Sequence, residues 1–373
     1  MVAVNLFVPT FAVDECLAEI RECLERGWTG IGYKTLEFEK RWCAYTGLPH
    51  AHLLNSATAG LHLALNIFKE ADGWNDNDEV ITTPLTFVST NHAILYERLA
   101  PVFADVDEFL CLDPDDVERK ITPRTRAVMF VGMGGNTGRF DQIAALCRKH
   151  GLRLIVDAAH MAGTRLNGAT PCGDVAVFSF HAVKPLPTAD SGMICFADEK
   201  FGALARKKSW LGINKDTFSR TLDQGSYRWR YDVESVGFKY HGNSIMAAIG
   251  IVQLRYLDRD TSYRRQISEW YDRGFANNNH IVRIPTALGC VSARHLYQIR
   301  VKNRDEMMLA LNEHEIFPGV HYLDNRAYPM YRREDDSCPR ATLASQQLIS
   351  LPLHLKLTHD DVQAVIDRVL ALA

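Results

Sequence analysis

Several features that mark other classes of protein are missing from this chain. No apolar run approaches the roughly 18 residues that a membrane span requires. The N-terminus has no basic segment followed by an apolar one, so no secretory signal peptide is expected. The net charge of −3 favours neither nucleic acid nor a membrane surface as a partner. We therefore expect a cytoplasmic protein.

Cysteine is also sparse. The nine cysteines are scattered along 373 residues, and no two of them form a Cys-x-x-Cys pair. The sequence thus indicates neither a zinc site nor a disulfide framework, and the odd count agrees with a reducing compartment. The chain has no internal repeat and no low-complexity segment.

The composition is that of an ordinary globular protein, with 47% hydrophobic and 23% charged residues. Its length suggests roughly two domains of about 150 residues each. In the first part of the chain, short apolar strands alternate with amphipathic helices, a pattern that predicts a parallel or mixed sheet covered on both faces. Strands are expected at residues 51–54, 79–82, 101–104, 127–131, 152–156, 174–180 and 192–196, and helices at 14–26, 35–45, 58–69, 91–97, 113–120 and 140–150.

The last third of the chain has a different pattern. Residues 243–257 have apolar side chains at helical spacing, and we expect them to form a long helix that links two domains. A smaller α+β domain should follow, with strands at residues 295–301 and 319–322 and helices at 304–314 and 358–372.

Two residues that follow buried strands carry the chemistry. Lys184 comes shortly after the strand at 174–180, and Asp157 directly follows the strand at 152–156. Alone, the lysine would be a solvated surface residue and the aspartate a helix N-cap. Together they are typical of a pyridoxal phosphate (PLP) site. PLP needs a lysine to form an imine with its aldehyde and a carboxylate to keep its pyridine nitrogen protonated.

Other candidate residues surround this pair. His160 could stack near the cofactor ring or hydrogen-bond its 3-oxygen, or it could be a satisfied core histidine. The start of the helix after Asn55 could bind phosphate through free backbone N–H groups, or be a plain capped helix. Phe87 could lie on the cofactor ring or belong to the core. The residues at that helix start are Ser56, Ala57 and Thr58.

In this order and spacing, these motifs resemble the DegT/DnrJ/EryC1/StrS family of PLP-dependent sugar aminotransferases. The motifs are Ser56-Ala57-Thr58-Ala59, Thr86-Phe87-Val88, Asp157-Ala158-Ala159-His160, Ser179-Phe180-His181-x-x-Lys184, Gly237-Phe238-Lys239-Tyr240-His241-Gly242-Asn243 and Gly319-Val320-His321-Tyr322. The resemblance implies an α/β protein of PLP fold type I. A large PLP-binding domain with an N-terminal arm (residues 1–245) would hold a mixed, mostly parallel seven-stranded sheet covered by helices. A small C-terminal α+β domain (residues 246–373) would follow.

The resemblance also implies a role for each matched residue. Lys184 would form the imine and then move protons between the donor's Cα and the cofactor's C4′, while Asp157 would pair with the pyridine nitrogen. His160 stands where many relatives have Gln. Phosphate would be held by Ala57, Thr58 and Ser179, and Phe87 would stack on the ring. The loop over residues 237–243 would enter the site of a neighbouring subunit, so that Lys239 and Asn243 approach the partner's phosphate in a homodimer with shared sites.

The chain departs from the family pattern in three places. Ala189-Asp190-Ser191-Gly192 replaces the usual Gly-Glu-Gly-Gly after the lysine, where a turn can require positive φ. Gly132-Met133-Gly134-Gly135-Asn136 replaces a His-x-Tyr-Gly stretch, and His241-Gly242 stands where Arg-Met is common. The last two lie near the expected substrate pocket and leave the substrate open.

The implied reaction is transfer of an amino group from L-glutamate to a keto sugar, nucleotide-linked, such as a 4-keto-6-deoxy or 3-keto hexose. Three alternatives remain. A sugar dehydratase of the same family would have histidine in place of Lys184. A cyclitol aminotransferase would use a keto-cyclitol as acceptor, and a non-catalytic regulator would keep only the fold.

Overall fold

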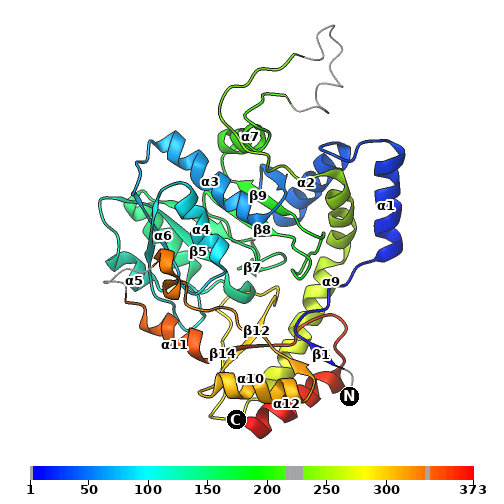
Figure 1. Ribbon diagram of the computed structural model, residues 1–373, viewed down its shortest axis with the longest axis vertical. Helices are drawn as coiled ribbons and strands as arrows, with labels where there is room; N and C mark the ends of the chain where they lie inside the picture. Colours follow the sequence, from blue (N-terminus) through cyan, green and yellow to red (C-terminus); the bar gives the residue numbers. More distant parts are fainter. Residues whose placement is uncertain (1–2, 216–217, 219–229, 332–336) are drawn as a thin grey trace.

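The structure is a computed structural model that describes residues 3–215, 218, 230–331 and 337–373 (Figure 1). At its centre is a seven-stranded sheet with strand order β2-β9-β8-β6-β5-β3-β4. Only β9 runs antiparallel to its two neighbours, so the sheet is mixed and mostly parallel, as predicted. The strands are β2 (Ala51–Leu54), β3 (Glu79–Thr82), β4 (Ala100–Phe103), β5 (Thr125–Val131), β6 (Arg153–Asp157), β8 (Val175–Ser179) and β9 (Gly192–Phe196).

Both faces of this sheet are buried, which the alternation along β5 makes clear. Val128 and Phe130 belong to one hydrophobic cluster, whereas Ala127 and Met129 belong to another, because successive strand residues point to opposite faces. The first cluster includes residues of α2 (Tyr33–Thr46), α6 (Phe140–His150) and α9 (Ser244–Gly274). The second includes residues of α3 (Ala57–Asp72), α4 (Val88–Tyr96) and α7 (Glu199–Lys208).

The sequence-based bounds of the seven sheet strands and of α2, α3, α4 and α6 agree with the structure within three residues. The remaining helices of this part are α1 (Val13–Glu25) and α5 (Pro114–Arg119), and Asp113 caps α5 by accepting a hydrogen bond from the Asp115 N–H. Helix α7 was not expected. Its basic last turn is typical of a helix C-terminus. Because few of its residues are apolar, hydrophobic periodicity did not indicate a helix there.

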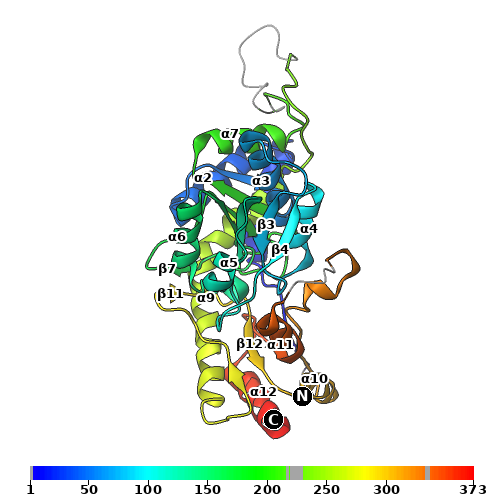
Figure 2. The ribbon, with the colours of Figure 1, turned by 90° about the vertical axis from the view of Figure 1, so that its left-hand side faces the viewer.

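A smaller lobe lies beyond the sheet (Figure 2). It has the antiparallel order β10-β12-β14 and a separate hydrophobic cluster. Helix α9 joins the two lobes, since Ile251 packs in the sheet cluster and Tyr271 in that of the small lobe (Figure 1). The elements are β10 (Val282–Arg283), β12 (Tyr297–Arg300), β14 (Leu348–Leu351), α10 (Arg304–Glu313), α11 (Pro339–Gln347) and α12 (His359–Leu372).

Two expectations for the small lobe need correction. The helix expected at residues 243–257 continues to Gly274, because its polar second half still buries a face against α12. The strand expected at residues 319–322 is wrong. The strand nearby is β13 (Ile316–Phe317), which pairs with β1 (Val4–Asn5), and after Pro318 the chain turns so that His321 and Tyr322 line a cavity. Two further short strands pair with each other, β7 (Arg165–Leu166) and β11 (Cys290–Val291).

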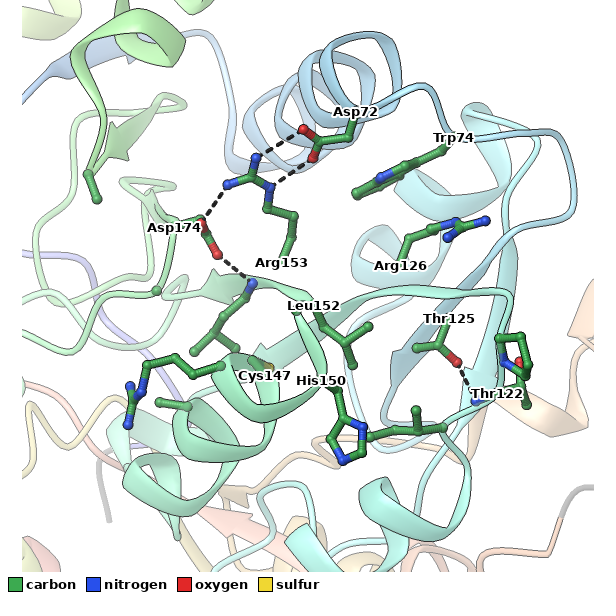
Figure 3. A pocket seen from close by; sticks show the side chains of 18 of the residues that line it. Asp72, Trp74, Thr122, Thr125, Arg126, Cys147, His150, Leu152, Arg153 and Asp174 are labelled. Carbon is green, nitrogen blue, oxygen red and sulfur yellow. Dashed lines mark hydrogen bonds and ion pairs between the residues drawn. The ribbon is translucent and has the colours of Figure 1, made fainter.

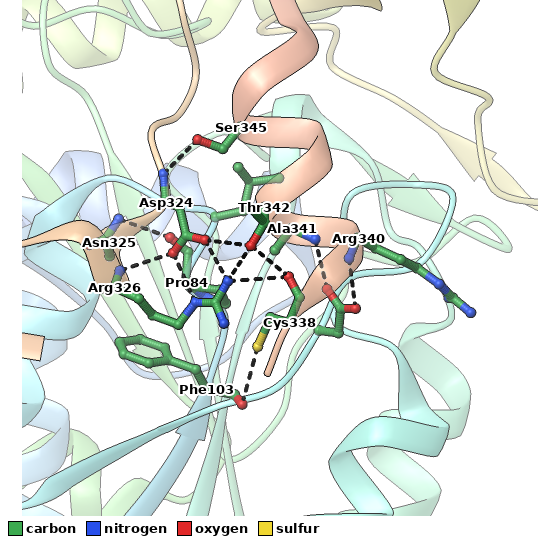
Figure 4. Close-up of polar contacts among 12 residues, drawn as sticks. Pro84, Phe103, Asp324, Asn325, Arg326, Cys338, Arg340, Ala341, Thr342 and Ser345 are labelled. Carbon is green, nitrogen blue, oxygen red and sulfur yellow. Dashed lines mark hydrogen bonds and ion pairs between the residues drawn. The ribbon is translucent and has the colours of Figure 1, made fainter. Parts of the chain in front are cut away.

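Polar contacts tie the small lobe to the loops after β3 and β4 (Figure 4). The side-chain amide of Asn325, which is 1% exposed, donates to the carbonyls of Pro84 (3.0 Å) and Thr86 (2.7 Å). The Asp105 carboxylate accepts from the backbone N–H groups of Arg340 (3.0 Å) and Ala341 (2.8 Å) in the first turn of α11. An acceptor at a helix N-terminus satisfies donors that have no intrahelical partner. The Asn325 bonds fix the loop that carries Phe87, and the Asp105 bonds fix the loop after β4.

Within the described ranges, no helix combines the length and the apolar content needed to cross a membrane. The division of the chain at residues 245 and 246 stays a prediction.

Candidate active site

A cavity of about 390 Å³ opens at the carboxyl ends of β6 and β8, beside the start of α3. This edge is where open α/β sheets bind their ligands. Eight of the ten predicted site residues line it, although they come from four separate segments of the chain. They are Ser56, Ala57, Thr58, Phe87, Asp157, His160, Ser179 and Lys184.

Lys184 sits in a turn after β8, where its N–H donates to the carbonyl of His181 (2.9 Å). Its Nζ atom lies 3.4 Å from Nε2 of His295. Burial lowers the pKa of Lys184 to about 8, and the Asp157 carboxylate opposes that shift. A lysine with this pKa is partly neutral near pH 7, and the neutral amine is the nucleophile.

The turn that carries Lys184 closes through hydrogen bonds of the segment behind it. Thr188 donates to the Phe180 carbonyl from its backbone N–H (2.9 Å) and from its hydroxyl (3.1 Å), and Phe180 N–H donates to the Ser191 carbonyl (2.8 Å). Ala189 adopts φ 96°, so the turn does need positive φ at a position where this chain has no glycine.

Asp157 ends β6 and is 4% exposed. One carboxylate oxygen accepts from the Thr90 hydroxyl (2.7 Å) and the other from the Ala159 N–H (3.1 Å). Burial raises the pKa of Asp157, while these two hydrogen bonds and Lys184 favour the charged form. A buried carboxylate held in this way is stabilised further by a cationic group in the cavity.

Both ring nitrogens of His160 have partners within the protein. The Gly134 N–H donates to Nδ1 (3.2 Å), and Nε2 lies 3.1 Å from the Tyr322 hydroxyl. Burial, followed by the nearby Lys184 and His321, holds the pKa of His160 well below its usual range. The ring is therefore neutral at physiological pH.

The start of α3 faces the cavity. Ser56 is the N-cap and its hydroxyl accepts from the Ala59 N–H (3.1 Å), while Ala57 and Thr58 begin the helix. First-turn N–H groups have no intrahelical acceptor and can bind an anion. Gly192 of β9 lets the strand approach, because a Cβ there would lie 2.6 Å from the Ala57 nitrogen.

Two further predicted residues complete the walls. Ser179 ends β8 and its hydroxyl accepts from the His181 N–H (3.4 Å). Phe87 is 57% exposed, with its ring 5.9 Å from that of Tyr322. An exposed aromatic ring at a cavity wall is free to stack on a ligand, which a core phenylalanine is not.

Lys239 and Asn243 do not line this cavity. The Lys239 ammonium lies 3.3 Å from the centre of the Trp210 ring, and Asn243 caps α9 by accepting from the Met246 N–H (3.0 Å). In one chain they therefore have local structural roles. Their approach to a partner's phosphate stays a prediction.

Sequence reasoning predicted no site role for twelve other residues of the cavity, among them Phe7, His295, His321 and Tyr322. The last two belonged to a quoted motif but had no role, and His295 lay inside a predicted strand. No sequence pattern indicated Phe7 as a site residue. Its ring stacks on His295 at 5.4 Å with an interplanar angle of 3°. Burial lowers the pKa of His295 far below its usual range and that of His321 to about 4.

The glycine-rich departure at residues 132–136 also has a structural reason. It forms a short 3-10 turn, Met133–Gly135, in which Gly134 and Gly135 have positive φ. A Cβ on Gly135 would lie 2.9 Å from the Ser292 hydroxyl and 3.1 Å from the His160 carbonyl. The turn thus lets the His160 and His295 segments meet. In the third departure, His241 packs edge-on against Trp210 at 4.6 Å.

A larger cavity, of about 1000 Å³, lies at the opposite, amino-terminal edge of the sheet (Figure 3). Its Arg153 is bound by Asp72 through two hydrogen bonds (2.8 and 3.0 Å) and by Asp174 through one (2.9 Å). None of the ten predicted residues lines it. Volume alone does not locate the chemistry, and the smaller cavity contains the reactive amine.

Known proteins resemble this chain in sequence and in fold. The chain matches the family described as the DegT/DnrJ/EryC1/StrS aminotransferase family over residues 12–370. Spore coat polysaccharide biosynthesis protein SpsC of Bacillus subtilis is 37% identical over 378 residues, which cover 97% of this chain and 95% of SpsC. The crystal structure of the aminotransferase TlmJ of Streptoalloteichus hindustanus matches with a TM-score of 0.91 at 33% identity, covering 99% of this chain and 98% of TlmJ.

Spr1654 of Streptococcus pneumoniae has been solved in a PLP form and a pyridoxamine phosphate (PMP) form. The PLP form matches at 26% identity over 98% of this chain and 97% of Spr1654, and the PMP form at 28% identity over 97% of each. The TM-score is 0.89 for both. This chain therefore belongs to the DegT/DnrJ/EryC1/StrS aminotransferase family, has the fold of PLP fold type I and is a transaminase.

Proposed function

We propose that this transaminase uses PLP to move an amino group from L-glutamate to a keto sugar that is linked to a nucleotide. The observation that carries the proposal is the pairing of Lys184, with a pKa of about 8, and the buried Asp157 carboxylate in one cavity. A lysine amine and a carboxylate in one site are the two protein groups that PLP chemistry requires.

The residues present fit the cofactor. Among the residues that the structure describes, the hydrogen-bond donors to Asp157 are neutral, namely Thr90 and the Ala159 N–H, so its charge suits a protonated ring nitrogen. The first turn of α3 offers N–H groups for a phosphate, and Phe87 offers an exposed ring for stacking. When bound, PLP supplies an aldehyde that takes up amino groups and a protonated ring that withdraws electrons.

Side chains of the protein supply the proton transfer, the counter-charge and the exclusion of water. Lys184 holds or releases a proton at Nζ near neutral pH, as a general acid–base must. Asp157 supplies the counter-charge at the end of β6. Neutral His295 and the Phe7 ring close one wall and exclude water from the amine.

The donor and acceptor are inferred from the family. SpsC is named as a protein of spore coat polysaccharide biosynthesis, which supports a sugar acceptor for its relative. The presence of lysine at position 184 disfavours the dehydratase branch, in which histidine would be expected there. A homodimer in which the partner's Lys239 and Asn243 complete each site, working in the cytoplasm, forms part of the same proposal.

The half-reaction tests this function. Purified protein loaded with PLP and mixed with L-glutamate should change to the PMP absorbance spectrum and release one 2-oxoglutarate per site. A set of acceptors should then restore the PLP spectrum: nucleotide-linked 4-keto-6-deoxy hexoses, 3-keto hexoses and a keto-cyclitol. Restoration by the cyclitol alone would identify a cyclitol aminotransferase. Failure to bind PLP would point to a non-catalytic regulator.

A further inference from the structure

One backbone hydrogen bond fixes the proton positions on His160. The Gly134 N–H donates to Nδ1 of His160 at 3.2 Å. A backbone amide is always the donor, so Nδ1 carries no hydrogen. The neutral ring must then carry its single hydrogen on Nε2.

The partner of that Nε2–H is Tyr322. Its hydroxyl oxygen lies 3.1 Å from Nε2, and the two rings are nearly parallel, with an interplanar angle of 22°. Because the imidazole is the donor, the Tyr322 oxygen accepts. Its own O–H hydrogen is therefore left over for another acceptor.

The surroundings hold this arrangement in place. The Gly134 carbonyl accepts from the His295 N–H (3.1 Å), so the residue that orients His160 also anchors His295. The His295 ring packs 4.4 Å from that of His160, with Phe7 stacked on it. His160 is 5% and His295 1% exposed, and such packing leaves neither ring room to turn.

The hydrogen of the Tyr322 hydroxyl has no protein acceptor within the described part of the chain. Its side chain lines the cavity together with Lys184, Asp157 and Phe87. Burial and the Asp157 charge raise the pKa of Tyr322, so this hydroxyl keeps its hydrogen at physiological pH. A held donor that faces a cavity and lacks a partner is ready for a ligand.

We propose that Tyr322 donates a hydrogen bond to an oxygen acceptor of the ligand beside Lys184, and that His160 is a positioning residue that acts through Tyr322. The acceptor is either the ring oxygen of PLP or an oxygen of the amino donor or keto substrate. The identity of the ligand rests on the proposed function, whereas the direction of the His160–Tyr322 hydrogen bond does not. His160 itself has no free polar atom for a ligand, which refines its predicted role.

Nitrogen NMR of the cofactor-free protein tests the orientation directly. In full-length protein labelled with ¹⁵N-histidine, the signals that disappear in His160→Gln should show a neutral ring with hydrogen on Nε2. A ring with hydrogen on Nδ1, or a doubly protonated ring, would overturn the proposal. This readout needs no cofactor and no turnover, so it stands even if the proposed reaction fails.

Variants test the link to the ligand. Tyr322→Phe should either weaken PLP binding to the cofactor-free protein about tenfold or raise KM for one substrate about tenfold, since a hydrogen bond to a charged acceptor is of that size. The first result assigns the acceptor to PLP, and the second assigns it to that substrate. No change in either quantity would refute the donor role.

His160 variants separate positioning from packing. Gln carries an acceptor oxygen and a donor NH₂, so His160→Gln can reproduce both hydrogen bonds, whereas His160→Leu can make neither. In PLP affinity or KM, His160→Leu should show the same loss as Tyr322→Phe, whereas His160→Gln should stay near wild type. The double variant with His160→Leu and Tyr322→Phe should lose no more than either single variant. Additive losses, or equal losses in Gln and Leu, would contradict the proposal.

A matched control is available elsewhere in the fold. The Tyr331 hydroxyl bonds Nδ1 of His92 at 2.5 Å, and neither residue lines the cavity. Tyr331→Phe removes the same chemical group from another tyrosine–histidine pair, in which the tyrosine is buried. It should leave PLP affinity and KM within about twofold of wild type, since surroundings distant from the ligand have little influence on its binding.

Discussion

The Nζ atom of Lys184 lies 3.4 Å from Nε2 of His295, an imidazole that is 1% exposed and stacked on Phe7. The reactive amine therefore faces a neutral ring, and the carboxylate of Asp157 acts on it only through space. This pairing keeps the amine in a site where its charged form is disfavoured. The first prediction follows from that environment.

Lys184 should react with acylating reagents at a lower pH than a surface lysine. Its pKa of about 8 means that the ammonium form dominates below pH 8 and the nucleophilic amine above it. In the cofactor-free protein, the acylation rate of Lys184 should rise about tenfold per pH unit up to pH 8 and then level off. Mass spectrometry of the labelled peptides gives this profile.

Exposed Lys302 serves as the internal reference in the same digest. Its profile corrects for the pH dependence of the reagent. A Lys184 midpoint near the ordinary lysine value of about 10.4 would show that the amine is not desolvated in solution.

Asp157→Asn should lower turnover by at least about a hundredfold. The amide keeps the shape of the side chain and can still accept from Thr90, but the counter-charge is lost from a buried site. Steady-state kinetics with L-glutamate measures the change. Near-normal turnover would show that Asp157 does not supply the counter-charge that the reaction needs.

Asp107→Asn is the matched control for that substitution. Asp107 is another buried carboxyl group, and burial raises its pKa to about 7. One of its oxygens accepts from the Phe109 and Cys111 N–H groups, which an amide oxygen can also do. Because Asp107 lies outside the active-site cavity, turnover should stay within about twofold of wild type.

The sequence predicts those site residues that a local sequence pattern marks, and it does not predict those that tertiary packing brings in. Lys184 and Asp157 could be found because each follows an apolar strand by a few residues, and parallel strands bring their carboxyl ends together. His295 and Phe7 could not, since they reach the cavity from 111 and 177 residues away from Lys184 along the chain through tertiary packing. Hydrophobic periodicity carries no information about such contacts.

For the fold as well, local sequence patterns predict some elements and miss others. The sheet strands were predicted well because each has a buried apolar centre and is bounded by turn residues. Strand β14 escaped because its Leu348–Leu351 run is short and follows α11 directly. The expected strand at residues 319–322 was wrong, since its aromatic and apolar character serves the cavity and not a sheet.

Asn325→Ala should destabilise the protein by about 3 kcal/mol. The change removes four side-chain hydrogen bonds at a residue that is 1% exposed and leaves the Thr86 carbonyl without its donor. Because these bonds fix the loop that carries Phe87, PLP affinity should also fall. Denaturant unfolding and a PLP titration measure the two effects.

Asn312→Ala provides the comparison for that variant. Asn312 is exposed on α10, so its replacement should change stability by less than about 0.5 kcal/mol and leave PLP affinity unaltered. If both asparagine variants unfold at the same denaturant concentration, the Asn325 hydrogen bonds do not stabilise the contact between the small lobe and the loop after β3.

Ala189→Gly should stabilise the protein by about 1 kcal/mol. Ala189 adopts φ 96°, a conformation that costs a residue with a Cβ roughly 1–3 kcal/mol and costs glycine little. The same substitution on the exposed face of a helix, Ala203→Gly in α7, should destabilise by about 1 kcal/mol. Chemical denaturation compares the two, and effects of the same sign would rule out strain at residue 189.

Reductive trapping tests the central claim most directly. Protein incubated with PLP and reduced with borohydride should carry one pyridoxyl group per chain, and peptide mass spectrometry should place it on Lys184. The Lys184→Ala variant should take up none at that peptide. An unmodified wild-type chain, or a pyridoxyl group found only on another lysine, would contradict the assignment of Lys184 and with it the proposed reaction.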